Sequence, residues 1–169
     1  MNAAIIIGRF NPPTTAHGVL IQHLLSIPNV KHFIFIIDGE KSSLNKDKNP
    51  LSGEYRRTLL SGLYPNAAID VASSPIEVFD ILEVQGYVLS DWIMGSDRID
   101  SYRKLIEYVQ YDVNLISIDR TNSPIKNVSA TCARRAARCG DSILFKQYLH
   151  KMDDNIAEDV MKLIERSGA

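Results

Sequence analysis

A short polar segment near the start of the chain, GRFNPPTTAHG at 8–18, carries the first side chains that could do chemistry. Arg9 offers a permanent positive charge, and His17 offers ring nitrogens that can donate or accept a hydrogen bond. The segment separates an apolar run from a stretch with helical periodicity, which indicates a turn leading into a helix. The free N–H groups and positive dipole end of a helix attract anions, and Arg9 and His17 would flank that position. This combination predicts a site for nucleotide phosphates.

The composition of this turn favours a fixed backbone. Gly8 lets the chain leave the preceding strand, while Pro12 and Pro13 restrict φ and stiffen the loop. Thr14 or Thr15 is a suitable N-cap for the following helix. The turn lacks the second and third glycines of a dinucleotide-binding fingerprint, so side chains would have to meet an anion. The alternative is purely structural, because proline-rich turns and isolated histidines also occur in proteins that bind nothing there.

A second polar segment, NVSATCARRAARCGD at 127–141, follows the last apolar run. Ser129 can cap a helix whose first turns carry Arg134 and two further arginines. Like charges at this spacing repel one another, so an anion nearby would stabilise the helix. Thr131 and Arg134 lie three apart and share a face, and arginine is suited to a bidentate grip on phosphate. The alternative for this segment is a solvated basic helix face.

Five short apolar runs are expected to be strands, and most are too continuously apolar to have one wet face. Stretches with helical periodicity alternate with them. This predicts an α/β fold with a doubly wound, Rossmann-like parallel five-stranded sheet and helices on both faces. After the fifth run only helical patterns remain, which predicts a C-terminal helical extension packed on the sheet. The runs are AAIII at 3–7, HFIFII at 32–37, AIDVA at 68–72, YVLSDWIM at 87–94 and VNLISI at 113–118.

Length and composition indicate one domain, 1–169. With 169 residues, 45% of them hydrophobic and 23% charged, the chain can bury a sizeable core without disulfides or metals. We expect residues 1–125 to form the sheet and its crossover helices. Residues 126–169 should form the anion-binding helix and the C-terminal helices. The last helical pattern has an apolar stripe of Ile156, Val160, Leu163 and Ile164.

Net charge, cysteine content and hydropathy limit which partners and which cellular compartment we expect. A formal net charge of −1 gives no reason to expect nucleic-acid binding. Cys132 and Cys139 lie in one predicted helix, which fits neither a zinc spacing nor a disulfide framework. No apolar run approaches ~18 residues, and MNAAIII lacks the features of a signal peptide. We therefore expect a cytoplasmic protein with no membrane partner.

The longest segment predicted to be irregular is DGEKSSLNKDKNPLSG at 38–53. An irregular segment of this length in a compact domain is usually functional or disordered. Lys41, Lys46 and Lys48 could form a mobile basic lid over an anion, or the segment could be an ordinary solvated loop.

The two polar segments together resemble the nucleotidyltransferase superfamily, which is the cytidylyltransferase-like group. GRFNPPTTAH at 8–17 is similar to its first motif, G-x-F-x-P-x-[H/T]-x-G-H, and VSATCAR at 128–134 is similar to its second, I-S-S-T-x-x-R. One follows the first expected strand and the other follows the last, and the resemblance covers nearly the whole chain. It implies an enzyme that transfers an NMP group from an NTP to an acceptor, usually a phosphate, and releases pyrophosphate.

The resemblance assigns three residues to catalysis. His17 matches the last histidine of the first motif, which binds the NTP phosphates and stabilises the transition state. Thr14 matches the motif's first histidine, and Arg134 matches the arginine of the second motif. The chain departs from the pattern at Ala16, which adds a methyl group where the family has glycine, and at Ala130, which replaces a serine. The first departure bears on the fit of the base, and the second removes a hydroxyl group.

Five more residues are implied as nucleotide-binding. Gly8, Arg9 and Phe10 would form the strand-end turn over the nucleotide. Ser129 and Thr131 would hold the β and γ phosphates together with the second-motif arginine.

The middle of the chain has two narrower likenesses. NPLSGEYR at 49–56 is similar to the N-P-F-x-x-x-E-R block of archaeal-type nicotinamide-nucleotide adenylyltransferases. MGSDR at 94–98 resembles a segment of nucleotidyltransferases encoded by large tailed phages. This likeness implies that Asp97 and Arg98 bind the acceptor. For Asp97 the alternative is a helix N-cap at the end of a strand.

The implied chemistry is direct in-line attack of an acceptor oxygen on the α-phosphorus, so no covalent nucleophile is needed. Mg²⁺ would be held mainly by substrate phosphates, since this ion keeps its waters and needs few protein ligands. We therefore assign no protein residue as a metal ligand. The expected partners are an NTP and a small phosphorylated substrate, and a homo-oligomer is also compatible with the resemblance.

Several functions remain open from the sequence. The leading one is adenylyl transfer from ATP to nicotinamide mononucleotide, giving NAD, because of the NPLSGEYR block. Cytidylyl transfer to a small phosphorylated alcohol is the nearest alternative, followed by a non-catalytic nucleotide-binding module of the same fold. A fragment of a class I aminoacyl-tRNA synthetase fails on size and on the lack of a K-M-S-K-S-like loop.

Overall fold

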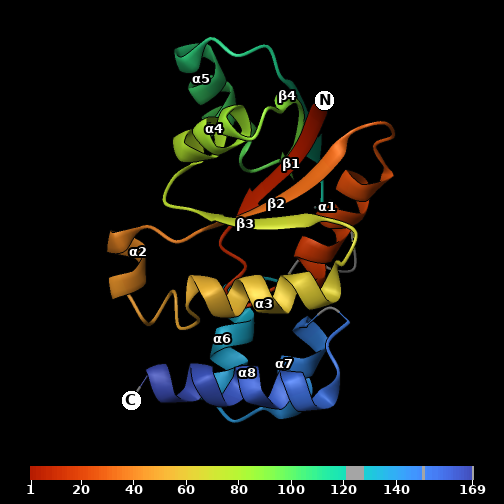
Figure 1. The fold of residues 1–169 in the computed structure, drawn as a ribbon. Coiled ribbons are helices and arrows are strands. Elements are labelled where there is room, and N and C mark those ends of the chain that lie inside the picture. The colour runs from red at the N-terminus through yellow and green to blue at the C-terminus, as the bar shows by residue number, and fades with distance from the viewer. Residues whose placement is uncertain (121–127, 150, 169) are drawn as a thin grey trace.

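Five parallel strands form one sheet, as the apolar runs predict (Figure 1). Their order in the sheet is β3-β2-β1-β4-β5. The computed structural model describes residues 1–120, 128–149 and 151–168. The strands start and end close to the predicted runs, because continuously apolar segments are stable only where both faces are covered. Their bounds are β1 Asn2–Gly8, β2 Lys31–Ile37, β3 Ala68–Ala72, β4 Val88–Gly95 and β5 Asn114–Ile118.

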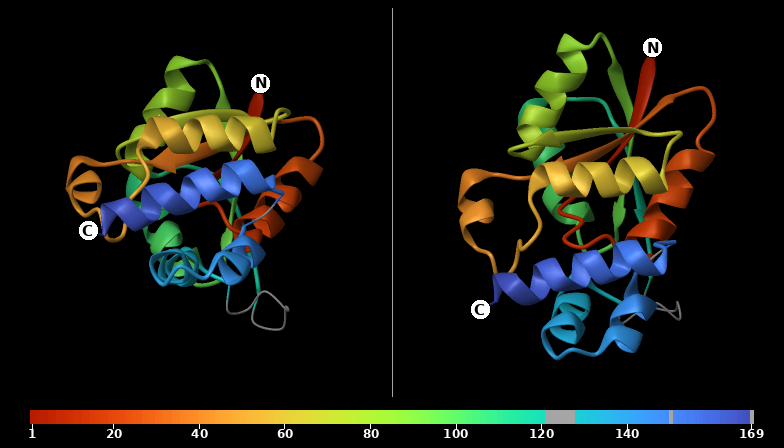
Figure 2. Two further views of the ribbon diagram at one scale, coloured as in Figure 1. Left: turned by 90° about the horizontal axis from the view of Figure 1, so that it is seen from below. Right: turned by 60° about the horizontal axis from the view of Figure 1, so that its bottom comes forward.

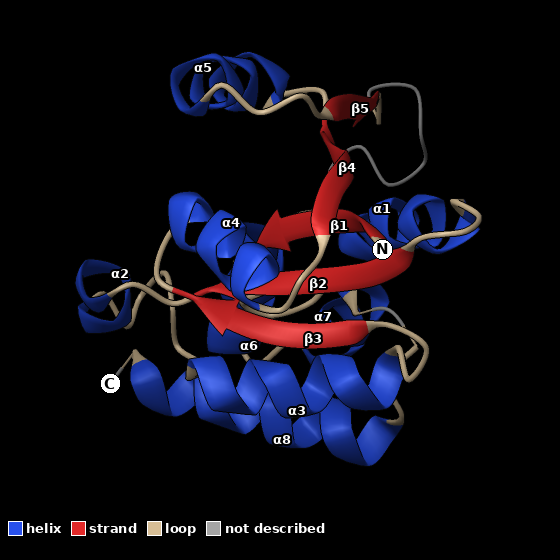
Figure 3. Cartoon of the chain, turned by 45° about the horizontal axis from the view of Figure 1, so that its top comes forward, coloured by secondary structure: helices blue, strands red, loops and turns tan. Residues whose placement is uncertain are grey.

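Helices cover both faces of the sheet because side chains alternate along each strand. Ile5 of β1 belongs to a core with residues of α4 and α5, whereas Ile6 belongs to the opposite core with residues of α1 and α3. Figure 3 shows these helices around the sheet. Trp92 of β4 is fully buried in the first of these cores. The helices on the two faces are α1 Thr15–Ser26, α3 Gly53–Leu63, α4 Pro75–Val84 and α5 Ile99–Val109.

The C-terminal helices build a third core, and the expectation that they pack on the sheet is wrong. These helices are α6 Ala130–Arg138, α7 Ser142–Tyr148 and α8 Asp154–Ser167. They enclose Phe145 together with Leu51 and Leu59, which come from the segment before α3 and from α3 itself. Figures 1 and 2 show α8 beside α3, on the side away from the strands. Helix α3 is therefore shared by two cores.

The predicted apolar stripe of α8 is only half correct. Val160 and Ile164 are buried, but Ile156 and Leu163 are 38% and 36% exposed. The face that packs inward is completed by a small and a flexible residue, Ala157 and Met161. Small side chains allow close helix packing, and a pattern based on large apolar residues alone misses them.

The segment 38–53 is not wholly irregular. It contains a short helix, α2 Glu40–Leu44, which has no buried residue. The last residue of the segment, Gly53, is the first residue of α3. The sequence did not reveal α2, because a short helix that buries no residue has no apolar periodicity.

The order of the strands reverses between β1 and β4. β1 pairs with both β2 and β4, so successive crossovers leave β1 in opposite directions. In doubly wound sheets a crevice opens at this point, beyond the carboxyl ends of the strands.

Across the described residues, no helix is long and apolar enough to cross a membrane.

The third core should contribute strongly to stability. The Phe145→Ala variant should lower the free energy of unfolding by about 3–5 kcal/mol, because truncating a buried aromatic side chain loses its burial and leaves a cavity. Phe145 is fully buried, whereas Ile143 in the same helix is 74% exposed. Ile143→Ala is therefore the control and should change the free energy by less than about 0.5 kcal/mol in urea unfolding. Equal effects of the two variants would contradict this core.

Candidate active site

One cleft of about 560 Å³ lies at the carboxyl ends of β1 and β4, where the strand order reverses. The ten residues that the sequence assigned to catalysis, nucleotide binding or acceptor binding all line this cleft. They come from the turn after β1, the start of α1, the turn after β4 and the start of α6. These residues are Gly8, Arg9, Phe10, Thr14, His17, Asp97, Arg98, Ser129, Thr131 and Arg134.

His17 is held by the cap of its own helix. Thr14 is the N-cap residue of α1, as expected. Its backbone N–H donates to Nδ1 of His17 at 3.0 Å, and its hydroxyl lies 3.0 Å from the same nitrogen. Nδ1 therefore acts as an acceptor, which leaves the proton of the neutral ring on Nε2. The ring also packs against Phe10, with 4.8 Å between the ring centroids.

The surroundings of His17 keep its ring neutral. Burial of the ring, followed by the positive charge of Arg120, lowers its pKa from 6.5 to about 4. Protonating Nδ1 would also set two donors, Nδ1–H and the Thr14 N–H, against each other. At neutral pH His17 is thus a hydrogen-bond donor at Nε2 and carries no charge.

The buried side chain of Phe10 supports the turn after β1. This residue has a positive φ of 49°, and its side chain is 1% exposed. The ring lies so close to Gly8 that a Cβ at position 8 would stand 3.0 Å from two ring carbons. A side chain at position 8 would therefore force the Phe10 ring to shift, and this ring packs against His17.

Arg134 joins α6 to the turn after β1. Its Nη1 donates to the carbonyl of Asn11 at 2.8 Å, and its Nη2 donates to the Thr131 hydroxyl at 3.2 Å. Ser129 caps α6 by accepting from the N–H of Cys132. Arg134 is 9% exposed, and burial followed by repulsion from other arginines lowers its pKa. No carboxylate of the described residues forms a salt bridge with it, so the site favours an added anion.

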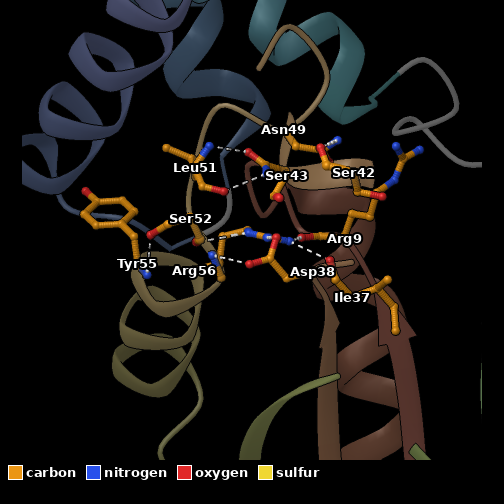
Figure 4. Close-up of polar contacts among 12 residues, drawn as sticks. Arg9, Ile37, Asp38, Ser42, Ser43, Asn49, Leu51, Ser52, Tyr55 and Arg56 are labelled. Carbon is orange, nitrogen blue, oxygen red and sulfur yellow. Dashed lines mark hydrogen bonds and ion pairs between the residues drawn. The ribbon is translucent and has the colours of Figure 1, made fainter. Parts of the chain in front are cut away.

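A second buried arginine holds the other end of the same turn (Figure 4). Arg56 of α3 is fully buried. It donates to the carbonyls of Arg9 at 2.6 Å, Ile37 at 3.0 Å and Ser52 at 3.2 Å. It also forms a 2.7 Å salt bridge with Asp38. Burial lowers the pKa of Arg56, and Asp38 opposes that shift.

The NPLSGEYR segment is joined to the turn by a reciprocal pair of hydrogen bonds. The side-chain amide of Asn11 donates to the Leu51 carbonyl, and its oxygen accepts from the Leu51 N–H, both at 3.0 Å. Asn49 donates to the Ser42 carbonyl at 2.8 Å. The segment resembling the adenylyltransferase block therefore supports the turn through its backbone and through Arg56.

The turn after β4 carries a small charged cluster. Asp97 lies 3.9 Å from Arg98 and 3.8 Å from Arg120, in exposed or half-exposed ion pairs. The alternative that Asp97 caps the next helix is wrong, because Arg98 is the N-cap residue of α5 and makes no side-chain cap. Gly95 makes room for this cluster, since a Cβ there would lie 2.6 Å from the Asp97 carboxylate.

The three lysines of segment 38–53 do not act together. Lys48 lines the cleft, whereas Lys41 and Lys46 line a separate shallow depression beside α2. Arg138 of α6 donates to the Asp47 carbonyl at 2.8 Å, which joins this segment to α6. Only Lys48 is placed to meet a ligand in the cleft.

Three residues of the site were not identified from the sequence: Asn11, Arg56 and Arg120. Asn11 and Arg56 lie inside the matched motifs, but their role is to bind backbone groups distant in sequence, which no spacing reveals. Arg120 lies two residues after the end of β5, and its place near a strand end was the available signal. Among the described residues, no group of three or more His, Cys, Asp or Glu side chains could hold a metal ion.

The fold and the cleft define a Rossmann-like α/β protein with a basic site at its topological switch point. No protein-family model matches the chain, and no curated protein does. The structure is nevertheless similar over nearly its full length to nicotinate-nucleotide adenylyltransferases, at low sequence identity.

Two of the similar structures are nicotinic acid mononucleotide adenylyltransferase from Plasmodium falciparum. The complex with NaAD has a TM-score of 0.67 and 18% identity, covering 99% of this chain and 97% of the other. The complex with APC has a TM-score of 0.65 at the same identity and coverage. A third, from Vibrio parahaemolyticus and provisionally named a nicotinate-nucleotide adenylyltransferase, has a TM-score of 0.67 and 15% identity, covering 98% and 96%.

The neutral state of His17 predicts a pH dependence of stability. Its pKa in the folded protein is about 4, below the usual 6.5, so the unfolded chain binds a proton first as the pH falls. The contribution of His17 to the free energy of unfolding is therefore fully present above pH ~6.5. It decreases by at most about 3 kcal/mol as the pH falls from ~6.5 to ~4.

Urea unfolding of the wild-type protein and of His17→Gln between pH 4 and 8 tests this expectation. The difference in unfolding free energy between the two proteins should move in favour of the glutamine variant as the pH falls. Parallel pH profiles of the two proteins would show that His17 has the same pKa in the folded and the unfolded state, contrary to this expectation.

Arg56 should be essential for stability, in contrast to its exposed neighbour. Arg56→Met removes the ion-pair partner of Asp38 and the side-chain donor to three main-chain carbonyls, so we expect a loss of about 3–5 kcal/mol. Arg57 is half-exposed and 4.0 Å from Glu54. Arg57→Met should cost less than about 1 kcal/mol in the same chemical unfolding experiment. Similar losses for both variants would argue against the buried network.

Proposed function

We propose that the protein is a nucleotidyltransferase that moves an NMP group from an NTP to a small phosphorylated acceptor and releases pyrophosphate. The observation that carries this proposal is the meeting of His17, Arg9 and Arg134 at the starts of two helices, in one cleft at the switch point. Helix starts and unpaired guanidinium groups are suited to a chain of phosphates. The structural similarity to adenylyltransferases supports the same class.

In this mechanism His17 and Arg134 stabilise the leaving pyrophosphate. His17 donates from Nε2 to a phosphate oxygen without needing a charge. Arg134 has five N–H donors, and the structure uses one on the Asn11 carbonyl and one on Thr131, so others remain for the β and γ phosphates. Ser129, Thr131 and Arg9 line the same cleft and would complete the phosphate contacts. Rate enhancement comes from positioning and from charge neutralisation.

Mg²⁺ would be held mainly by the substrate phosphates. Among the described residues of the cleft, Asp97 is the only carboxylate, and it already lies near Arg98 and Arg120. A site with at most one carboxylate suits an ion that keeps its waters and is bound through phosphates. Such an ion would neutralise charge on the phosphate chain.

The finer proposal is ATP as donor and a pyridine mononucleotide as acceptor. The NPLSGEYR likeness favours nicotinamide mononucleotide, and the similar structures favour nicotinic acid mononucleotide. Cytidylyl transfer to a phosphorylated alcohol is the second enzymatic candidate. A non-catalytic nucleotide-binding module is the remaining one, and Ala16, buried against the cleft in place of the motif's glycine, is the observation that favours it.

Pyrophosphate release with Mg²⁺ tests the proposal. ATP and CTP are each combined with nicotinamide mononucleotide, nicotinic acid mononucleotide, phosphopantetheine and glycerol phosphate. We expect turnover with ATP and a pyridine mononucleotide, and we expect His17→Ala to reduce it by ~100-fold to ~1000-fold, as for the loss of one preorganised donor.

His23→Ala is the matched control, because His23 lies in the last turn of the same helix and is exposed. Its activity should equal that of the wild type. Binding of ATP without turnover of any acceptor would refute the enzymatic proposal in favour of the binding module, and turnover with CTP alone would refute the adenylyl assignment.

A further inference from the structure

Arg120 is a cation of the cleft that none of the sequence motifs includes. It lies two residues after the end of β5 and lines the cleft with His17 and Arg134. Its guanidinium lies over the end of β4, where a Cβ at Gly95 would stand 3.0 Å from Nη2. The strand pairing of β4 with β5 runs to Gly95 and Ile118, which fixes Arg120 beside the turn after β4.

Among the described residues, Asp97 forms an ion pair with Arg120, and this pair is weak. Asp97 lies 3.8 Å away, and its side chain is 68% exposed, whereas that of Arg120 is 28% exposed. Exposed ion pairs at such distances contribute little to stability. A phosphate that enters the cleft can therefore replace or share this interaction with Arg120 at small cost.

Arg120 lies close enough to His17 for its charge to act there. Its positive charge is the electrostatic cause that lowers the pKa of His17, after burial. Arg9 and Arg134 line the same cleft from the turn after β1 and from α6. Arg120 instead approaches from the β4–β5 side, next to Asp97 and Arg98.

In-line transfer requires the attacking and leaving oxygens on opposite sides of the α-phosphorus. If the pyrophosphate leaves toward His17 and α6, the acceptor must approach from the side of the turn after β4. The acceptor phosphate and the phosphate chain of the NTP are both anionic and repel each other. A cation beside them reduces this repulsion.

Resting on the function proposed above, we propose that Arg120 is a catalytic residue that binds the phosphate of the acceptor and brings it to the α-phosphorus. One oxygen of that phosphate forms the new bond to the α-phosphorus. The bond from the α-phosphorus to the bridging oxygen breaks, and its electron pair leaves with the pyrophosphate. Arg120 keeps its charge throughout and exchanges no proton.

The test compares Arg120→Met with Arg103→Met. Arg103 lies on α5, is half-exposed and pairs with Asp100 at 3.4 Å, outside the cleft. Binding of ATP, nicotinic acid mononucleotide and nicotinamide mononucleotide is measured by calorimetry, and kcat and KM are measured by pyrophosphate release. NMR titration of His17 gives a readout that does not require turnover.

Arg120→Met should weaken mononucleotide binding and raise the acceptor KM by about 10-fold to 100-fold, as for the loss of a charge-assisted hydrogen bond. ATP binding should change less than mononucleotide binding, the pKa of His17 should rise, and Arg120→Lys should restore part of the affinity. Arg103→Met should behave as the wild type.

Unchanged mononucleotide binding in Arg120→Met, or an equal loss in Arg103→Met, would overturn the proposal. Weakened mononucleotide binding in Arg120→Met without turnover by the wild type would support the binding of the mononucleotide phosphate by Arg120 and refute the proposed enzymatic function. A wild-type protein that binds neither ATP nor mononucleotide would overturn both.

Discussion

The shape of the site depends on two buried guanidinium groups that hold one turn. Arg56 donates to the carbonyl of Arg9, and Arg134 donates to the carbonyl of Asn11. A buried cation is tolerated only where acceptors satisfy its N–H groups. The turn supplies those acceptors, so any rearrangement of its backbone would leave buried charges unsatisfied. The positions of Phe10 and His17 are consequently set before a ligand enters.

This constraint connects the cleft to parts of the fold that lie far from it. Arg134 belongs to α6, whose apolar face is part of the third core with Phe145. Leu51 belongs to the same core and also forms two hydrogen bonds with Asn11. The C-terminal helices thus position one cation of the cleft without packing on the sheet. Loss of that core should impair the site as well as the stability.

Electrostatics gives the cleft its preference for anions. Its neutral donor is His17, kept uncharged by burial and by the N–H of Thr14. Around it the described lining residues include five permanently or normally cationic side chains against one carboxylate, that of Asp97. These cations are Arg9, Lys48, Arg98, Arg120 and Arg134. Their mutual repulsion is relieved when an anion binds, which favours phosphate-rich ligands over neutral ones.

The sequence by itself determined the strands, the layer architecture and the two polar segments, because apolar runs and capping residues act locally. It also identified ten residues that meet in one cleft, since the segments that carry them follow strands and parallel strands end at one edge. Only the tertiary structure decided that the C-terminal helices form their own core and that Arg56 holds the turn. It likewise brought Arg120 into the same cleft as His17. These outcomes depend on contacts between residues distant in sequence, and the energy of such contacts is not encoded in any local pattern.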